Sequence, residues 1–181
     1  MERFVALLPL GGSVLDLGCG SGQPLACHLL DRGFTVFGVD SSPTLISKCR
    51  SRFPKGEWTV ADMRTLSINR RFEGVIAWDS FFHLSHEDQR AMFVVFREHA
   101  NCGAPLLFTT GTGHGEAIGS FQGESLYHAS LSPGEYRTLM KNPALPGGVS
   151  SQFKLRLTRL LLALVLDIVP NRRLVDPHRG G

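Results

Sequence analysis

A carboxylate and three alternating glycines follow a short apolar run near the start of this 181-residue chain, in the stretch Val14-Leu15-Asp16-Leu17-Gly18-Cys19-Gly20-Ser21-Gly22. An apolar run bounded by glycines is typical of a buried strand in a parallel sheet. Glycines allow a sharp turn and let a ligand approach the backbone closely. Helical character resumes after Pro24, so free N–H groups are expected at the start of a helix beside this turn. The stretch therefore predicts a nucleotide-type pocket.

The spacing within this stretch favours a cationic nucleotide over a dinucleotide. A dinucleotide-binding turn carries its third glycine three residues after the second, and Gln23 occupies that position. Asp16 would also repel a pyrophosphate at short range, since like charges would meet. A nicotinamide-dependent oxidoreductase is kept as the less favoured enzyme class.

Three further acids, Asp40, Asp62 and Asp79, each follow an apolar run that reads as a buried strand. Asp40 lies 24 residues after Asp16, where a carboxylate can accept hydrogen bonds from both hydroxyls of a ribose. Taken singly, Asp62 and Asp79 could equally be turn or cap residues. Because ligands bind beyond the carboxyl ends of parallel strands, the four acids are expected at one edge of a sheet. The strands are expected over residues 14–17, 35–39, 57–60, 74–77 and 105–110.

The string from Asp16 to Gly22 resembles the first motif of the class I S-adenosylmethionine-dependent methyltransferases. The resemblance extends from about Arg3 to about Met140, and two more stretches, 77–84 and 114–124, look like small bacterial members whose substrate is unassigned. It implies an α/β, doubly wound, mostly parallel sheet with S-adenosylmethionine as cofactor. The implied reaction is methyl transfer to a small-molecule acceptor.

The resemblance also assigns cofactor contacts to residues of this chain, which fall into four groups. Those implied for the methionine end are Asp16, Gly18, Cys19 and Gly20; for the ribose, Asp40 and Ser41; for the adenine, Asp62 and Met63; and for the reacting end, Trp78 and Asp79.

A long glycine-rich segment after the fifth expected strand, residues 111–128, is the first candidate for acceptor binding. Loops of this length are usually functional or disordered, and this one is expected on the cofactor side of the sheet, as a lid. Its candidate substrate-binding residues are His114, Glu116, Tyr127 and His128. Their spacing matches no zinc pattern, so no metal is predicted.

His83 is the candidate catalytic residue, because it follows Asp79 closely and a histidine can accept a proton near neutral pH. A histidine at a helix entry that bonds only to backbone is an equally acceptable interpretation. Methyl transfer often needs no strong acid or base, because the sulfonium is already electrophilic and the protein mainly aligns the reactants.

Serine caps predict where three helices begin. Ser42 precedes Pro43, and Ser85 and Ser132 each stand three residues before an acid, as in a capping box. The helices are expected over residues 43–52, 86–99 and 133–140.

Composition and charge favour one domain in a reducing, cytoplasmic setting. The four cysteines have no metal-type spacing, and no apolar run is long enough to span a bilayer or resembles a leader. Charge is uneven, with 11 Lys and Arg against 14 Asp and Glu up to residue 136, and 8 against 2 from Arg137 onward. No aromatic residues interleave with the basic residues, so a nucleic-acid partner is not favoured. Oligomeric state is not predicted.

The C-terminal part departs from the family pattern, so the methyltransferase domain is assigned to residues 1–140 and an atypical segment to 141–181. Residues 154–169 first alternate and then become continuously apolar, which fits either a strand or a helix. The family's final antiparallel strands are therefore expected to be atypical or missing, leaving an unpaired sheet edge. Little sequence precedes the glycines. A catalytically inert binding module is thus the second alternative function.

Overall fold

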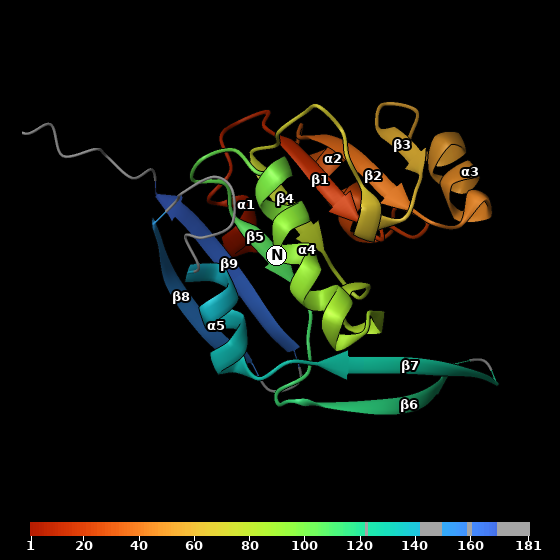
Figure 1. Cartoon of the computed structure of the whole chain (residues 1–181). Helices are drawn as coiled ribbons and strands as arrows, with labels where there is room; N and C mark the ends of the chain where they lie inside the picture. The colour runs from red at the N-terminus through yellow and green to blue at the C-terminus, as the bar shows by residue number, and fades with distance from the viewer. Residues whose placement is uncertain (122, 142–149, 159–160, 170–181) are drawn as a thin grey trace, which may run out of the picture.

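A five-stranded parallel sheet forms the centre of the computed structural model, which describes residues 1–121, 123–141, 150–158 and 161–169 (Figure 1). The strands run in the order β3-β2-β1-β4-β5, and every neighbouring pair is parallel. This order changes direction between β1 and β4, which places a ligand crevice at their carboxyl ends. The strands are β1 (Ser13–Leu17), β2 (Thr35–Asp40), β3 (Glu57–Val60), β4 (Gly74–Ala77) and β5 (Leu106–Phe108).

Helices cover both faces of the sheet, which confirms the doubly wound fold predicted from the sequence. Successive residues of β1 enter opposite cores: Val14 packs with residues of α1, α2 and α3, whereas Leu15 packs with residues of α4 and α5. This alternation follows from the strand's two-residue period. The helices are α1 (Glu2–Val5), α2 (Leu25–Asp31), α3 (Pro43–Arg52), α4 (His86–His99) and α5 (Pro133–Lys141), with 3-10 turns η1 (Met63–Thr65) and η2 (Phe81–His83).

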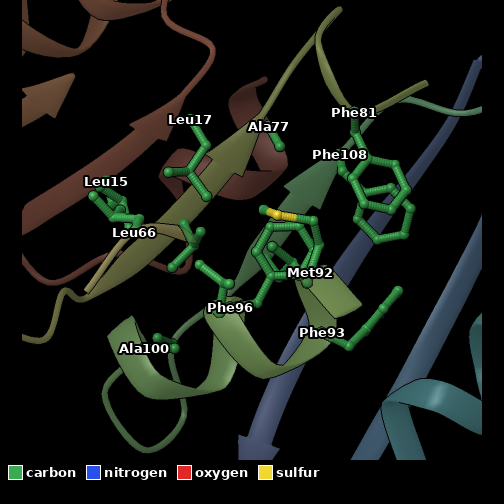
Figure 2. Packing of buried hydrophobic residues seen from close by; sticks show 14 of the residues in the cluster. Leu15, Leu17, Leu66, Ala77, Phe81, Met92, Phe93, Phe96, Ala100 and Phe108 are labelled. Carbon is green, nitrogen blue, oxygen red and sulfur yellow. The ribbon is translucent and has the colours of Figure 1, made fainter. Parts of the chain in front are cut away.

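An aromatic cluster joins α4 to the sheet (Figure 2). The ring of Phe81 lies 4.7 Å from that of Phe108 and 5.8 Å from that of Phe96, measured between centroids. Phe93 meets the Phe108 ring edge-on at 5.9 Å. Because Phe81 belongs to η2, this cluster anchors the segment that carries His83.

The three predicted serine caps are confirmed. The side-chain oxygens of Ser42, Ser85 and Ser132 accept hydrogen bonds from backbone amides three residues further on, at 3.3, 3.1 and 3.2 Å. Each bond satisfies one N–H group that lacks a partner within its helix. The starts of α3, α4 and α5 therefore lie where the sequence places them.

The segment expected as a long loop over residues 111–128 is mostly an antiparallel hairpin, so that prediction was wrong. Strands β6 (Gly115–Phe121) and β7 (Glu124–Ser130) pair along their lengths and extend beneath α4 (Figure 1). The amide of Gly111 donates to the Ser130 side-chain oxygen at 2.6 Å and so fixes the base of the hairpin.

Two strands also occur in the segment for which the sequence left strand and helix open. β8 (Ser150–Thr158) and β9 (Leu161–Val169) pair antiparallel and form a sheet of their own, with β9 lying beside β5. Of the two possibilities predicted, atypical or missing C-terminal strands, the structure shows strands that are present as a small antiparallel sheet. Parts of the predicted 141–181 segment lie outside the described residues, and its boundary at residue 140 stays a prediction. No helix among the described ranges is long and apolar enough to cross a membrane.

Replacing Phe96 by alanine should lower the free energy of unfolding by about 3–5 kcal/mol, the usual cost of emptying a buried phenylalanine site. Phe96 is 3% exposed and contacts three other rings of the cluster. Urea denaturation measures the change, with the fully exposed Leu10→Ala as control. Equal effects of the two substitutions would contradict the packing described for α4.

Candidate functional site

The glycine loop, residues 18–22, joins β1 to α2 and uses glycine where other residues would be strained. Gly18, Gly20 and Gly22 have φ angles of +72°, +57° and +78°. A Cβ on Gly18 would lie 2.3 Å from the Cβ of Ser80, so the loop packs directly on the segment after β4. A Cβ on Gly20 would meet no atom within 4 Å, so the loop leaves open space at that point.

Backbone N–H groups of the glycine loop are bonded within the protein. The amides of Gly18 and Cys19 both donate to the carbonyl of Val39, at 2.7 and 3.0 Å. The amide of Gly20 donates to Oδ2 of Asp40 at 2.9 Å. These three groups are therefore not free to bind a phosphate, even though the loop has the glycine content of a phosphate-binding turn.

Asp40 at the end of β2 connects the glycine loop to α3. Its Oδ2 accepts the Gly20 amide, and its Oδ1 accepts the Ser42 amide at 2.9 Å. Each carboxylate oxygen has more than one acceptor site, so both oxygens can accept a further hydrogen bond from a ligand hydroxyl.

Asp62, which caps η1, is held by Arg64. The guanidinium contacts both carboxylate oxygens of Asp62, at 2.6 Å in its shortest bond, and reaches Oδ2 of Asp88 on α4 at 3.3 Å. Hydrogen bonding from Arg64 lowers the pKa of Asp62. This carboxylate therefore stays ionised while it forms a link between η1 and α4.

Asp79 follows β4 in a strained backbone conformation, with a φ of +50° that non-glycine residues rarely adopt. Its amide donates to Oγ1 of Thr109 at 2.8 Å, and the neighbouring Ser80 donates from Oγ to the carbonyl of Leu17 at 2.7 Å. These bonds fix the strained turn against the carboxyl ends of β1 and β5.

A cavity of about 520 Å³ opens at this edge of the sheet and contains most of the predicted site residues. Eight of its lining residues are predicted site residues: Gly18, Gly20, Asp40, Ser41, Asp62, Met63, Asp79 and His83. The sequence does not predict the other six, which are Val39, Ala61, Arg64, Ser80, Leu84 and Asp88. Ser80 and Arg64 adjoin predicted residues, which is a usable signal, whereas Asp88 enters from α4 through a contact that no local pattern indicates.

Three predicted cofactor residues, Asp16, Cys19 and Trp78, do not line the cavity. Asp16 and Cys19 are only 3% and 7% exposed, and Trp78 packs against the core that faces α1, α2 and α3. Asp16 thus lies beneath the glycine loop, where its charge can act on a ligand without direct contact.

The hairpin brings two of its four candidate residues to His83. Nδ1 of His83 lies 3.0 Å from the carbonyl oxygen of Tyr127, and the His83 and His128 rings are 5.0 Å apart between centroids. Since a carbonyl oxygen only accepts, Nδ1 carries the hydrogen, and Nε2 is the nitrogen with a free lone pair.

The other two hairpin candidates group with His86 at the start of α4. His114 stacks on the His86 ring at 4.4 Å, and Oε1 of Glu116 lies 3.4 Å from Nδ1 of His86. Within the described ranges, no three His, Cys, Asp or Glu side chains converge as a metal site. These contacts give His114 and Glu116 a place at the base of the hairpin, apart from the residues that line the cavity.

Comparisons with known proteins find methyltransferases that are similar to this chain. Residues 14–103 match the family described as "Methyltransferase domain". Over 78 residues the chain is 37% identical to a dTDP-3-amino-3,6-dideoxy-alpha-D-glucopyranose N,N-dimethyltransferase of Streptomyces fradiae, covering 42% of this chain and 30% of the relative. It is 29% identical over 101 residues to a dTDP-3-amino-3,4,6-trideoxy-alpha-D-glucopyranose N,N-dimethyltransferase of Streptomyces venezuelae, covering 55% and 42%. The chain thus spans less than half the length of either relative.

Solved structures share the fold at low sequence identity. A SAM-dependent methyltransferase of Methanosarcina mazei superposes with a TM-score of 0.75 at 15% identity, covering 94% of this chain and 99% of that one. An amino pentose methyltransferase of Micromonospora echinaspora, solved with SAM bound, gives a TM-score of 0.70 at 17% identity, covering 93% and 88%.

Asp16 should make stability depend on pH. Burial, and then the nearby carboxylate of Asp40, raises the pKa of Asp16 from 3.8 to about 7. Between these two values the folded state keeps a proton that the unfolded state has released, so stability is lost as the pH rises from about 4 to 7. Asp16→Asn removes this loss. The free energy of unfolding of the variant should therefore exceed that of the native protein by an amount that grows across this pH range and reaches about 4 kcal/mol. Urea denaturation at several pH values measures the difference, and a difference that does not change with pH would contradict the burial of an ionisable Asp16.

Proposed function

Because the chain belongs to the class I S-adenosylmethionine-dependent methyltransferases, we propose that it binds S-adenosylmethionine in the 520 Å³ cavity and transfers its methyl group to a small-molecule acceptor. The observation that carries the proposal is the bonding of the glycine loop. Its amides at residues 18–20 donate to Val39 and Asp40, while carboxylates face the cavity.

The charge of the cavity supports a cationic ligand without phosphate. Asp40, Asp62, Asp79 and Asp88 line it, opposed among the described lining residues by Arg64. S-Adenosylmethionine carries a sulfonium and an ammonium group, which this field attracts, whereas a pyrophosphate would meet carboxylates and would lack the loop amides it needs. A nicotinamide cofactor is therefore not favoured.

We assign each part of the cofactor to a group of residues at the cavity. Gly18 and Gly20 would pass beside the methionine end, with Asp16 acting from beneath and Cys19 and Trp78 supporting the loop from the core. Asp40 with Ser41 would hold the ribose hydroxyls, Asp62 with Met63 the adenine, and Asp79 the reacting end. Bound in this way, the cofactor would supply an electrophilic methyl group.

We propose an amine as the acceptor and His83 as the group that takes its proton. Both Streptomyces relatives are named for methylating an amino sugar nitrogen, and Asp79 and Asp88 can attract a substrate ammonium. Nε2 of His83 would accept the ammonium proton, the nitrogen lone pair would bond to the methyl carbon, and the carbon–sulfur pair would return to sulfur. His128, whose ring lies beside that of His83, is the hairpin side chain best placed to contact the acceptor. Tyr127 would act through the carbonyl that holds His83, whereas His114 and Glu116 would help to hold the hairpin.

A cytoplasmic location is part of the proposal. Cys19, Cys27 and Cys49 carry free thiols, which suits a reducing compartment. The proposal also includes a small-molecule acceptor as partner, with no membrane or nucleic-acid partner.

Asp40→Ala should weaken the binding of S-adenosylhomocysteine by about 1–3 kcal/mol, the range for hydrogen bonds to a charged group. Because Asp40 also holds Gly20, a ligand lacking both ribose hydroxyls separates the two roles. In the native protein the 2′,3′-dideoxy analogue should bind more weakly than S-adenosylhomocysteine, and in Asp40→Ala the two should bind alike. Calorimetry measures this, with NAD in parallel. An unchanged preference for the hydroxylated ligand would remove the ribose assignment, and tight NAD binding would remove the cofactor assignment.

His83→Asn should lower kcat by roughly 10²-fold or more without a matching change in cofactor affinity, because the amide can still donate to Tyr127 but offers no basic nitrogen. Turnover with a panel of primary and secondary amines measures this, with His28→Asn on α2 as control. Native-like kcat in His83→Asn would refute the base. Cofactor binding by the native protein without turnover of any acceptor would favour the inert binding module.

A further inference from the structure

We propose that Gln89 on α4 is a positioning residue that holds His83 in its proton-accepting form, an inference that rests on the proposed function for its catalytic consequence. Gln89 is fully buried, and it is not among the residues that line the cavity. Its side-chain amide bonds to both segments that meet at His83, namely the residue that ends η2 and strand β7.

All the polar atoms of the Gln89 side chain are engaged. Nε2 donates one hydrogen to the carbonyl of Leu84 at 3.0 Å and the other to the carbonyl of Ala129 at 2.9 Å. Oε1 accepts a hydrogen bond from the hydroxyl of Tyr136 at 2.6 Å. Bonds of this kind are fixed in direction because an amide NH₂ group is planar.

The carbonyls that accept from Gln89 lie close in the chain to the two residues of another hydrogen bond, the one between His83 and Tyr127. Leu84 directly follows His83, and Ala129 lies two residues after Tyr127 on β7, whose carbonyl contacts Nδ1 of His83 at 3.0 Å. One amide group thus bonds on both sides of the gap between η2 and β7 across which this His83 bond must form. The hairpin extends beneath α4 (Figure 1). It is bonded to α4 by Gln89 through Ala129 and by His86, whose Nε2 lies 3.1 Å from the carbonyl oxygens of Gly115 and Ser130.

The His83 bond decides which ring nitrogen is basic. With Nδ1 donating to Tyr127, Nε2 has a lone pair and can accept a proton. If η2 and β7 separate, Nδ1 loses its acceptor, and the hydrogen can reside on Nε2, which then cannot act as a base. Gln89 would therefore control His83 at a distance, without contact with cofactor or acceptor.

A purely structural role would predict a different response. Met has nearly the same shape as Gln and would fill the same space, but Gln89→Met removes both N–H donors from the two carbonyls. Tyr136→Phe is the matched control, because it removes bonds to Gln89, Leu131 and Thr110 in the same buried network while leaving the Gln89 amide on Leu84 and Ala129. Both variants should lose stability, but only Gln89→Met should disturb His83.

The decisive measurement is the imidazole tautomer of His83, observed by long-range ¹⁵N–¹H NMR in full-length protein labelled at histidine. The native protein and Tyr136→Phe should show the Nδ1–H form, and Gln89→Met should show a substantial Nε2–H population. In steady-state assays with an amine acceptor, kcat of Gln89→Met should fall about 10-fold or more with an altered pH profile, while KM for S-adenosylmethionine changes less than about 2-fold. If Gln89→Met does not fold, Gln89→Glu carries the test, since it keeps the shape and the acceptor for Tyr136 but has at most one donor for the two carbonyls.

The outcomes separate the two proposals. Retention of the Nδ1–H form in Gln89→Met, or an equal tautomer change in Tyr136→Phe, overturns the positioning role whatever the activity. A tautomer change with native kcat and pH profile overturns its catalytic consequence. If the native protein transfers no methyl group to any acceptor, the proposed function fails, and the NMR result still decides what Gln89 does.

Discussion

The hydrogen bonds from the glycine loop to Val39 and Asp40 are the constraint on which the rest of the site depends. They bend the loop back onto the end of β2, which requires the positive φ angles at Gly18 and Gly20. The same bonds occupy the amides that a phosphate would need, while the acids at the strand ends stay beside the cavity. A glycine-rich turn is thereby adapted to a cation. The cavity is negative because the loop amides are already hydrogen-bonded within the protein, whereas the carboxylates beside the cavity are not neutralised by them.

Local sequence signals determine the sheet and the helix starts well. Apolar runs that end in Asp or Gly mark strands buried on both faces, and serine caps act within four residues of where they occur. The β6–β7 hairpin was missed because β6 is largely exposed and carries mixed polar and small residues, so no apolar alternation marks it. The C-terminal strands were undecided for the opposite reason, because a continuous apolar run has no period to read.

The candidate site was predictable where it is local and was missed where it depends on packing. Asp40, Asp62 and Asp79 follow strands, so topology alone brings them to one edge of the sheet. The link from Arg64 to Asp88 and the amide of Gln89 require knowing how α4 lies against η1, η2 and β7. The contacts of Arg64 with Asp88 and of Gln89 with Ala129 join residues 24 and 40 positions apart, and periodicity contains no information about them.

Two features that reduce stability lie at the cofactor edge of the sheet. Asp16 is buried there at a cost that its raised pKa records, and Asp79 takes a left-handed conformation that glycine would adopt without strain. An apolar residue at position 16 and a glycine at position 79 would give a more stable chain. Stability alone therefore does not explain these residues, whereas a bound cation does, because it would stabilise the ionised Asp16 and draw on the charge of Asp79. The two destabilising residues lie where the proposed ligand would bind, and functional sites are where strain in a fold is expected.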